Sequence, residues 1–433
     1  MSLHGFRAEI LATPADPASG DSKAIVHHPD GLLVVEDGIV IACGDFRALW
    51  PRFPALEITA FPGKLITPGF VDIHVHYPQT DHIAAYGAQL LEWLDRHIFP
   101  AEAAFANPAH AARVADLFLG ELLRNGTTSA LVFATVHEQS VDALFEAALR
   151  HDMRLIGGKV LMDWGPEGLS DTAESGRAET EALIARWRGR GRLGYAVTPR
   201  FAITSSEAQL AQAGAVLAAH PDVLLHTHLA ETRREVAEVA ALFPAQRDYL
   251  AVYERFGLVG PRSVFAHAIH LDEGAMGRLG RAGSSIAFCP SSNLFLGSGL
   301  FDLALAERCG CHVGVGTDVG AGSSFSMLRT LGEAYKVCQL RGENLDPLRA
   351  FYLATVGGAR ALGIQDRIGA LQVGQEADFV VLDDASTPLL ARRTAGAALK
   401  DRLFALQILG DDRAVSRTYL KGRLAHDRDG LRA

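Results

Sequence analysis

The 433-residue sequence lacks the features of a membrane or secreted protein. No apolar run approaches the about 20 residues that a membrane-spanning helix needs, so we expect no membrane partner. The N-terminus has no basic stretch followed by an apolar core and a small-residue cleavage site, so no signal peptide is expected. The five cysteines are odd in number and form no CxxC pair, which is typical of a reducing, cytoplasmic compartment rather than of a disulfide framework or a zinc knuckle.

Signals for nucleic-acid and phosphate binding are also missing. The formal net charge is −9 and no clustered basic stretch is visible, whereas a nucleic-acid partner needs a basic face that neutralises phosphates. The glycine-rich run GVGTDVGAGSS (314–324) contains no GK[ST] and does not keep GxGxxG spacing, so it does not indicate a phosphate loop. We therefore expect no nucleic-acid partner.

The two ends of the chain carry short β-strand patterns. Within residues 32–45, two β-rich runs flank Glu36-Asp37-Gly38, which indicates a hairpin. The runs ADFVVLD (377–383) and RTYLKGRLAHD (417–427) predict further short strands. Neither end has enough strands for a sheet with its own core, so we expect residues 1–67 and 376–433 to meet in one small β-sandwich domain.

The middle of the chain, residues 68–375, alternates between β-rich runs and helical patterns. The segment 109–125 has apolar residues at three- and four-residue spacing and stops at Gly126, and the segments 140–153 and 205–220 behave similarly. Repeated strand–helix alternation predicts an α/β fold with a parallel sheet, and eight units fit a (β/α)8 TIM-like barrel. The eight β-rich runs are 71–76, 127–135, 154–163, 194–203, 223–231, 263–271, 284–292 and 312–320.

Histidines interrupt these apolar runs near their C-terminal ends, where a barrel of this kind carries its active site. His74 and His76 end the first run, and their two-residue spacing directs both imidazoles to one face of a strand. His226 and His228 form a second such pair in the fifth run, and His267 lies in the sixth. A single histidine is more often a core or surface residue, but two on one strand face favour a metal site, because neutral imidazole is the commonest ligand.

Two acidic residues complete the candidate site. Asp318 closes the eighth run, where a buried carboxylate needs a partner, either a metal ion or the N-terminus of the following helix. The histidines on three other runs favour the metal ion. Three histidines and one aspartate leave a position for water, whose pKa a metal ion lowers toward ~7. Glu231, three residues beyond His228, is then the candidate general acid/base, unless it only favours the dipole of the next helix.

The combined motifs resemble the metal-dependent amidohydrolases, in the branch with one metal ion and no carboxylated bridging lysine. The resemblance covers nearly the whole chain and rests on PGFVDIHVH (68–76), HTHLAE (226–231), FAHAIHL (265–271), GTDVG (316–320) and IGALQVGQEADFVVLD (368–383). Within that branch, four features resemble the guanine deaminases: HYPQTD (76–81), LLEWLDRHIFPAE (90–102), TPRF (198–201) and CPSSNLFLGSG (289–299).

The resemblance implies roles for the polar residues at the strand ends. It implies that Asp318 is both a metal ligand and a proton acceptor and that Glu231 is the proton shuttle. His267 is implied as a catalytic residue near the metal ion that contacts the hydrolytic water or the substrate, with direct binding of the metal ion as the alternative. It leaves His226 without a role other than a supporting or structural one. The metal ligands that it implies are His74, His76, His228 and Asp318.

The same resemblance implies a set of substrate contacts. Arg200 would bind the O6 and N7 edge of guanine in the fork-to-edge geometry that arginine uses for this base elsewhere; the alternative is a solvated surface charge. Phe201 would stack on the ring and Gln79 would bond a ring nitrogen or carbonyl. Trp93 is either a wall of the pocket or a core residue. Glu231 would also contact the substrate.

The implied reaction is hydrolytic deamination of guanine to xanthine and ammonia, with attack at C2 by a metal-activated hydroxide. The H-x-E and P-C-x-x-C signature of the zinc deaminases that act on nucleic-acid bases is missing, so we expect the free base as substrate and a role in purine catabolism. The alternatives are 8-oxoguanine, a triazine or an adenosine-derived thioether as substrate, or a barrel-shaped binding protein without activity. The resemblance implies one zinc ion per subunit, with iron as the alternative, and a homodimer.

Overall fold

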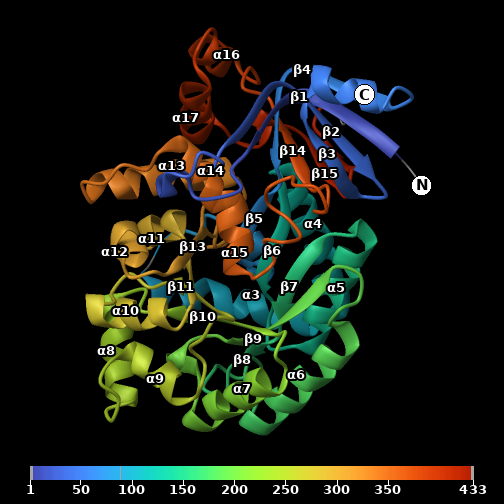
Figure 1. The fold of residues 1–433 in the computed structure, drawn as a ribbon. Helices are drawn as coiled ribbons and strands as arrows, with labels where there is room; N and C mark the ends of the chain where they lie inside the picture. The colour runs from blue at the N-terminus through green and yellow to red at the C-terminus, as the bar shows by residue number, and fades with distance from the viewer. Residues whose placement is uncertain (1–2, 88, 431–433) are drawn as a thin grey trace.

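The computed structural model describes residues 3–87 and 89–430, which form a barrel and a separate sheet (Figure 1). All neighbouring barrel strands pair in parallel, in the order β13-β12-β11-β10-β9-β7-β6-β5, with β8 paired to β9. The barrel strands are β5 (Phe70–His76), β6 (Thr127–Phe133), β7 (Arg154–Gly158), β8 (Val160–Leu161), β9 (Leu193–Pro199), β10 (Leu224–Leu229), β11 (Ser263–His267), β12 (Ser285–Phe288) and β13 (His312–Val315).

Backbone hydrogen bonds beyond the end of β13 close the barrel. The N–H of Asp318 donates to the carbonyl of His74, and the N–H of His76 donates to the carbonyl of Val319, both at 2.9 Å. Each of the eight predicted runs contains a strand, and the third run is divided between β7 and β8. The predicted (β/α)8 barrel is therefore confirmed, and its closure brings the first and eighth strands together at their C-terminal ends.

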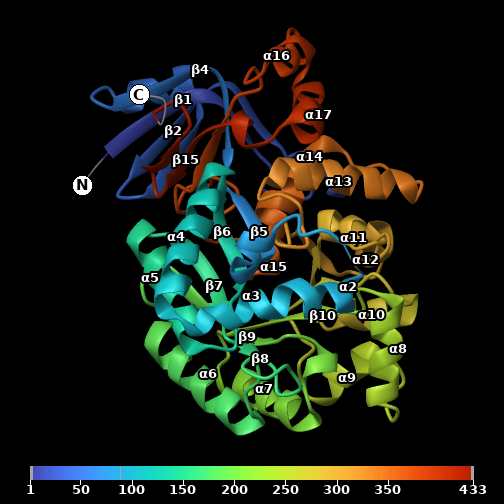
Figure 2. The same cartoon turned by 180° about the vertical axis from the view of Figure 1, so that it is seen from behind.

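The helices that follow the strands cover the outside of the barrel (Figures 1 and 2). The three helices expected from sequence are present as α4 (Pro108–Arg124), α5 (Glu138–His151) and α7 (Glu207–Ala219). Helix α4 begins where the sequence favours it, because the Asn107 side chain accepts from two free backbone N–H groups and Pro108 occupies the first helical position. The other helices around the barrel are α6 (Ala173–Trp187), α8 (Arg233–Leu242), α9 (Tyr249–Arg255), α10 (Glu273–Arg281), α11 (Pro290–Phe295), α12 (Leu303–Arg308), α13 (Met327–Leu340), α14 (Pro347–Tyr352) and α15 (Gly358–Ala361).

One further helical segment crosses the barrel between β5 and α4. It consists of α2 (Leu90–Trp93), a π-helical stretch (Leu94–Ile98) and α3 (Phe99–Ala103), which follow one another without interruption (Figure 2). Short π-helical stretches occur frequently at functional sites, because the extra residue per turn redirects side chains. This segment contributes side chains to the cavity described below.

The two ends of the chain form one seven-stranded sheet, in the order β16-β15-β14-β4-β1-β2-β3. The predicted hairpin joins β2 and β3 through Asp37 and Gly38, whose φ angles of 49° and 86° are the positive values that a tight hairpin turn requires. The strands are β1 (Leu3–Ala12), β2 (Val26–Glu36), β3 (Ile39–Asp45), β4 (Glu57–Pro68), β14 (Phe379–Leu382), β15 (Val415–Leu420) and β16 (Arg423–Asp427), and α1 (Phe46–Leu49) follows β3.

This sheet curls over itself. The ring centroids of Phe6 on β1 and Tyr419 on β15 are 5.1 Å apart, although two strands separate β1 from β15 in the sheet. A flat sheet would hold strands at those positions ~14 Å apart. The two halves therefore face each other across an aromatic core, which confirms the predicted β-sandwich. The limits at residues 67, 68, 375 and 376 stay a prediction, and residues 1–2 and 431–433 of the predicted domain lie outside the described residues.

The sheet packs on the N-terminal ends of the barrel strands. Arg192, which precedes β9, is buried and forms ion pairs with Asp378 and, at 2.6 Å, with Glu376. Thr418 on β15 donates a hydrogen bond of 2.7 Å to the carbonyl of Leu123 on α4. The opposite rim of the barrel, at the C-terminal strand ends, is left for the candidate site.

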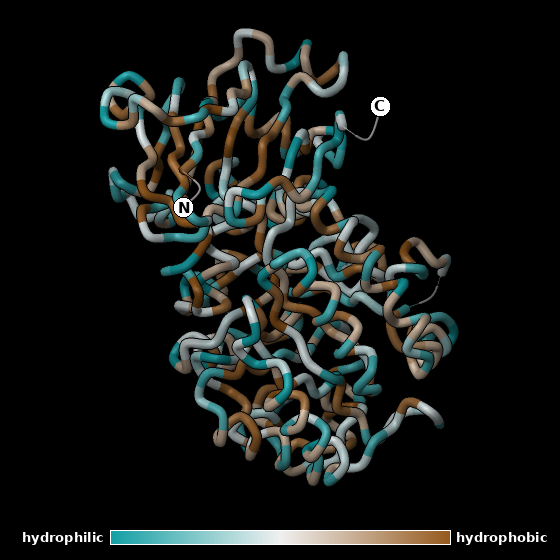
Figure 3. The backbone as a smooth tube through the Cα atoms, turned by 90° about the vertical axis from the view of Figure 1, so that its right-hand side faces the viewer, coloured by the Kyte–Doolittle hydropathy of each residue, from teal (hydrophilic) through white to brown (hydrophobic). Residues whose placement is uncertain are grey.

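Two helices of the C-terminal region were not expected. Helices α16 (Pro388–Thr394) and α17 (Leu399–Leu409) lie between β14 and β15; they pack against each other, and α17 packs against α13 (Figure 1). Hydrophobic residues concentrate along the strands of both units, while the outer helices are mixed (Figure 3). Within residues 3–87 and 89–430, no helix combines the length and apolar character needed to cross a membrane. The five cysteines are all free.

Candidate active site

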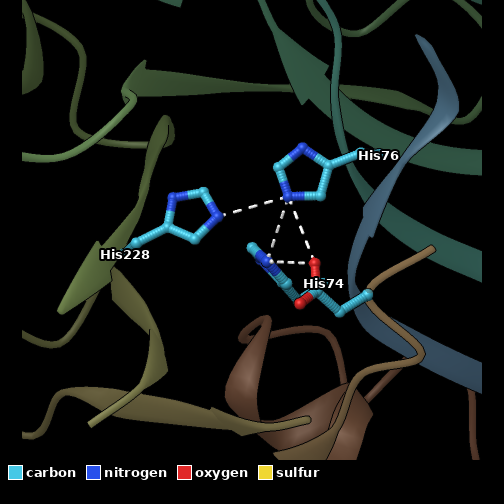
Figure 4. Close-up of side chains that lie close together, drawn as sticks. His74, His76 and His228 are labelled. Atoms are coloured by element: carbon cyan, nitrogen blue, oxygen red, sulfur yellow. Dashed lines mark hydrogen bonds and ion pairs between the residues drawn. The ribbon is translucent and has the colours of Figure 1, made fainter. Parts of the chain in front are cut away.

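Four side chains meet at the C-terminal ends of β5, β10 and β13 (Figure 4). The Nε2 atom of His76 lies 3.3 Å from Nε2 of His74 and 3.2 Å from Nε2 of His228. An oxygen of Asp318, Oδ1, lies 3.1 Å from Nε2 of His74 and 3.3 Å from Nε2 of His76. The structure thus brings together all four residues that the resemblance implied as metal ligands, although 244 positions separate the first from the last in the sequence.

Most separations within this group fit a tetrahedral metal ion. A zinc ion with bonds of about 2.0–2.1 Å to nitrogen and oxygen holds its ligand atoms about 3.3 Å apart. Four of the six separations between the ligand atoms are 3.1–3.3 Å and match that spacing, and all four atoms lie within 4.8 Å of one another. The Nδ1 atom of His228 lies 2.7 Å from the carbonyl oxygen of Arg200, which can only accept, so the imidazole proton is on Nδ1 and Nε2 offers its lone pair to the group.

Burial keeps these imidazoles neutral. It lowers the pKa of His76 to about 3, and it lowers the pKa of His228 well below the ordinary histidine value. A neutral imidazole is the form that binds a metal ion, because a protonated ring has no lone pair to offer. The site is therefore prepared for a cation at neutral pH.

A second layer of polar groups orients the first histidine. Nδ1 of His74 lies 2.6 Å from Nε2 of His226, so His74 can donate its Nδ1 proton to His226 and offer Nε2 to a metal ion. The buried carboxylate of Asp72 accepts from the backbone N–H groups of His74 and Thr317, at 3.2 and 3.1 Å. His226, which sequence reasoning left without an assigned role, and Asp72 thus support the ends of β5 and β13.

Glu231 and His267 lie beside the four-residue group. The Glu231 carboxyl accepts a hydrogen bond of 2.7 Å from Ser298, and its other oxygen lies 3.5 Å from Nε2 of His267. Burial and then the negative charge of Asp318 raise the pKa of Glu231 to about 8. A carboxyl group whose pKa is near neutral can both accept and return a proton. His267 is oriented by Nδ1, which lies 2.9 Å from the side-chain oxygen of Asn293.

The backbone at these strand ends adopts a conformation that non-glycine residues rarely use. Ala230, His267 and Asp318 have φ angles of 50°, 71° and 51°. Each such residue costs about 1–3 kcal/mol and persists only where the surrounding structure enforces it. The strain occurs where β10, β11 and β13 turn their last side chains toward one point, which is typical of a functional site.

A cavity lies next to this group, with about 390 Å³ of space that includes its opening to solvent. Phe201 and Trp93, which were expected to contact a substrate, are both buried and line the cavity; Trp93 also packs in the core with Leu94 and Phe99, so both of its expected roles apply. The lining residues are His76, Gln79, Leu90, Trp93, Leu94, Arg200, Phe201, His228, Glu231, His267, Leu296, Asp318 and Ala321.

Arg200 lies at the cavity, buried and paired with a carboxylate that the sequence did not indicate. Only 2% of it is exposed, so it is not a solvated surface charge. Its Nη1 lies 2.9 and 2.7 Å from the two carboxylate oxygens of Glu102. Gln79 donates from Nε2 to Oε1 of Glu102 at 3.2 Å. The two expected substrate contacts therefore share one buried carboxylate.

Sequence reasoning did not single out Glu102, Asp72, Asn293 or Ser298. The signal was available in part, because each lies inside a motif that carried the resemblance: 90–102 for Glu102, 68–76 for Asp72 and 289–299 for the other two. What was missing is the partner of each residue, which is distant in the sequence.

Comparisons with known proteins agree with this geometry. Residues 65–425 match the model of the amidohydrolase family. The guanine deaminase of Escherichia coli (strain K12) is 51% identical over 431 residues, which cover 99% of this chain and 98% of that protein. A solved E. coli guanine deaminase structure matches 99% of this chain and 100% of its own, with a TM-score of 0.95 and 47% identity. A guanine deaminase structure from C. acetobutylicum with guanine bound in the active site matches 98% of this chain and 100% of its own, with a TM-score of 0.90 and 27% identity.

Proposed function

The chain belongs to the amidohydrolase family, and from this premise we propose that it hydrolyses guanine to xanthine and ammonia. One observation carries the proposal. A neutral imidazole cluster with a carboxylate, a proton-transfer group and a buried arginine border the same cavity. These are the parts that hydrolysis of an amidine carbon in a flat, uncharged base requires.

We propose that His74, His76, His228 and Asp318 hold one divalent metal ion, with zinc as the expected ion and iron as the alternative. Support comes from the separations of 3.1–3.3 Å between four of the six pairs of ligand atoms and from the nitrogen and oxygen donor set. When bound there, a divalent metal ion supplies a hydroxide nucleophile at neutral pH by lowering the pKa of a water molecule.

The substrate is held by its ring face and its polar edge. Phe201 stacks on the base, and Arg200 and Gln79 bind the edge that carries O6 and N7, as arginine does when it binds guanine elsewhere. Trp93 and Leu296 close the apolar walls and exclude water. This orientation directs C2 and its amino group toward the histidine cluster, where the reaction occurs.

Glu231 and its neighbours move the protons. Glu231 accepts one proton from the attacking water and delivers it to a ring nitrogen, and the second proton of the water passes by way of Asp318 and Glu231 to the departing amine. The water oxygen becomes bonded to C2, the bond from C2 to the amino nitrogen breaks, and xanthine and ammonia leave. Asp318 accepts a proton from the water, and His267 hydrogen-bonds the water or the tetrahedral intermediate, with its orientation held by Asn293.

A purine screen of the metal-loaded protein tests the proposal. Guanine should yield xanthine, measured by chromatography, and one equivalent of ammonia. The comparison set is 8-oxoguanine, a chlorinated triazine and an adenosine-derived thioether. They should react at least ~10²-fold less efficiently, since N7 of 8-oxoguanine carries a proton and cannot accept a hydrogen bond, and the other two compounds have no O6. The absence of xanthine from guanine would overturn the substrate assignment.

The remaining expectations depend on the sequence alone. A homodimer, a cytoplasmic location and a role in purine catabolism stay predictions. Size measurement in solution and localisation of the tagged chain are the tests.

A further inference from the structure

We propose that Glu102 is a positioning residue that sets the ligand preference of the cavity, so that the site accepts an uncharged oxopurine and disfavours an anionic one. This inference rests on the proposed function, because it assumes that Arg200 and Gln79 bind the purine edge. Glu102 itself does not line the cavity. Its effect passes through the two residues that it holds.

The three side chains come from separate parts of the barrel rim. Glu102 is 1% exposed and belongs to α3, Arg200 follows β9, and Gln79 lies in the turn after β5. The Glu102 oxygens lie 2.7 and 2.9 Å from Nη1 of Arg200, and Oε1 also accepts from Nε2 of Gln79 at 3.2 Å. One carboxylate therefore contacts both edge-binding residues.

The first consequence concerns charge. A buried arginine without a partner is costly, and Glu102 supplies the opposite charge at hydrogen-bonding distance. Glu102 contacts only Nη1 of the guanidinium, and within residues 3–87 and 89–430 the Nε and Nη2 groups of Arg200 have no hydrogen-bond partner. Arg200 thus offers N–H groups to a ligand from a pair that is neutral overall. A carbonyl oxygen fits such donors without adding net charge to the site.

The second consequence concerns the amide of Gln79. A carboxylate only accepts hydrogen bonds, so the group facing Glu102 must be the amide nitrogen. A backbone N–H only donates, so the group facing Gly320 N, at 3.2 Å, must be the amide oxygen. These two contacts determine the orientation of the amide. Glu102 therefore also decides which face of Gln79 is available to a ligand.

If charge determines the ligand preference, substitution of Glu102 and substitution of Arg200 should have opposite effects on the binding of anions. Glu102→Gln leaves Arg200 as an uncompensated buried cation, which favours an anionic ligand. Arg200→Gln leaves Glu102 as an uncompensated buried carboxylate, which disfavours an anionic ligand more strongly. A loss of packing or of folded structure alone would change the relative affinity for anions in the same direction in both variants. The sign of that change therefore separates an effect of charge from an effect of structure.

The test compares two oxopurines that lack the amino group at C2 and so are not deaminated there. Hypoxanthine is uncharged and urate is an anion at pH 7.5. Calorimetry at that single pH, on the metal-loaded full chain, gives the ratio of the urate Kd to the hypoxanthine Kd. We expect this ratio to fall about tenfold or more in Glu102→Gln and to rise in Arg200→Gln, relative to the unsubstituted protein. The other ionisable groups at the cavity, Glu231, Asp318 and three histidines, are common to all the proteins compared.

The kinetics of guanine hydrolysis add a second measurement, because a purely structural role of Glu102 would not change KM more than kcat. Glu102→Gln should raise KM for guanine about ten- to a hundredfold with a smaller change in kcat, because ground-state positioning is lost while the proton-transfer group stays. The matched control is Asp378→Asn, which removes another buried carboxylate from its arginine, Arg192, at the opposite end of the barrel. It should leave both the Kd ratio and KM unchanged.

The outcomes separate this inference from the proposed function. Equal Kd ratios in Glu102→Gln and the unsubstituted protein would overturn the inference, and so would shifts of the same sign in the two variants. If Glu102→Gln does not fold, Arg200→Gln tests the inference alone: the ratio of its urate Kd to its hypoxanthine Kd should rise, and an unchanged or lower ratio would overturn the inference. If one of these contrary results is obtained and the unsubstituted protein still releases xanthine from guanine, the proposed function stands and only the role of Glu102 is rejected. A protein that releases no xanthine from guanine rejects the proposed function first.

Discussion

The Nδ1 atom of His228 lies 2.7 Å from the backbone carbonyl oxygen of Arg200. This contact joins an expected metal ligand on β10 to an expected substrate contact after β9. It determines the tautomer of His228, because a carbonyl accepts and cannot donate. It also links the orientation of the His228 ring to the backbone of the cavity wall at Arg200.

Removal of the metal ion should abolish activity and lower stability. Protein treated with a chelator should lose guanine hydrolysis and regain it when zinc is added. Since only the folded chain holds the four ligands together, metal at 100 times its Kd should stabilise the protein by about 2.7 kcal/mol. Thermal unfolding with and without zinc measures this shift. Activity that survives complete metal removal, verified by elemental analysis, would contradict the proposed ligand group.

Glu231→Gln should lower kcat by about 10²- to 10⁴-fold, the usual contribution of a general acid/base. The amide keeps the size of the side chain and can still bond to Ser298, so metal content should not change. Steady-state kinetics and elemental analysis of the same sample measure both quantities. The matched control is Glu238→Gln, a half-exposed acid on α8 that does not line the cavity, which should retain full kcat.

Stability of the metal-free protein should decrease with rising pH because of Glu235. Burial, and then the charge of Glu231, raises the pKa of Glu235 to about 7 from the ordinary 4.5. The folded state therefore holds this proton more tightly than the unfolded state, and the contribution is present below pH 4.5 and lost as pH rises through 7. The loss amounts to about 2–3 kcal/mol.

Urea unfolding between pH 4.5 and 8 measures this effect by comparison with Glu235→Gln. The amide can still accept from the backbone N–H groups of Glu231 and Thr232 but does not titrate. The difference in unfolding free energy between the unsubstituted protein and Glu235→Gln should change by about 2–3 kcal/mol across this pH range. Parallel pH profiles for the two proteins would show that Glu235 is not responsible.

Arg192→Ala should destabilise the chain by about 3–5 kcal/mol, because it leaves the buried carboxylate of Asp378, and the partly buried one of Glu376, without this cation at the junction of sheet and barrel. Arg186→Ala removes a half-exposed pair with Asp142, at 2.6 Å, and should cost about 0–1 kcal/mol. Urea unfolding of both variants gives the comparison. Equal losses would mean that the junction does not depend on the buried charges.

The barrel was predictable because its strands are short apolar runs bounded by turns, and because local hydrophobic pattern is what determines such strands. The curled sheet followed from the shortage of strands at each end. Helices α16 and α17 were not foreseen, since their sequence lies between two strand patterns and α17 packs on α13, which is distant in the chain. The π-helical stretch at Leu94–Ile98 leaves no local pattern either.

The histidine cluster was foreseeable because its residues end strands whose C-terminal ends meet at one rim. The pairing of Glu102 with Arg200 was not, because the two residues are 98 positions apart and neither has an unusual local context. Likewise, nothing local indicates that His226 contacts His74 across the barrel. Pairwise contacts between distant polar residues depend on how the strands close, and a sequence pattern describes only single strands.

Anomalous diffraction from crystals of the zinc-loaded protein tests the central claim most directly. Data collected on both sides of the zinc absorption edge should give one strong peak per chain, equidistant at about 2.0–2.2 Å from Nε2 of His74, His76 and His228 and from Oδ1 of Asp318. A peak bound elsewhere, or none at these four atoms in protein that still hydrolyses guanine, would contradict the account.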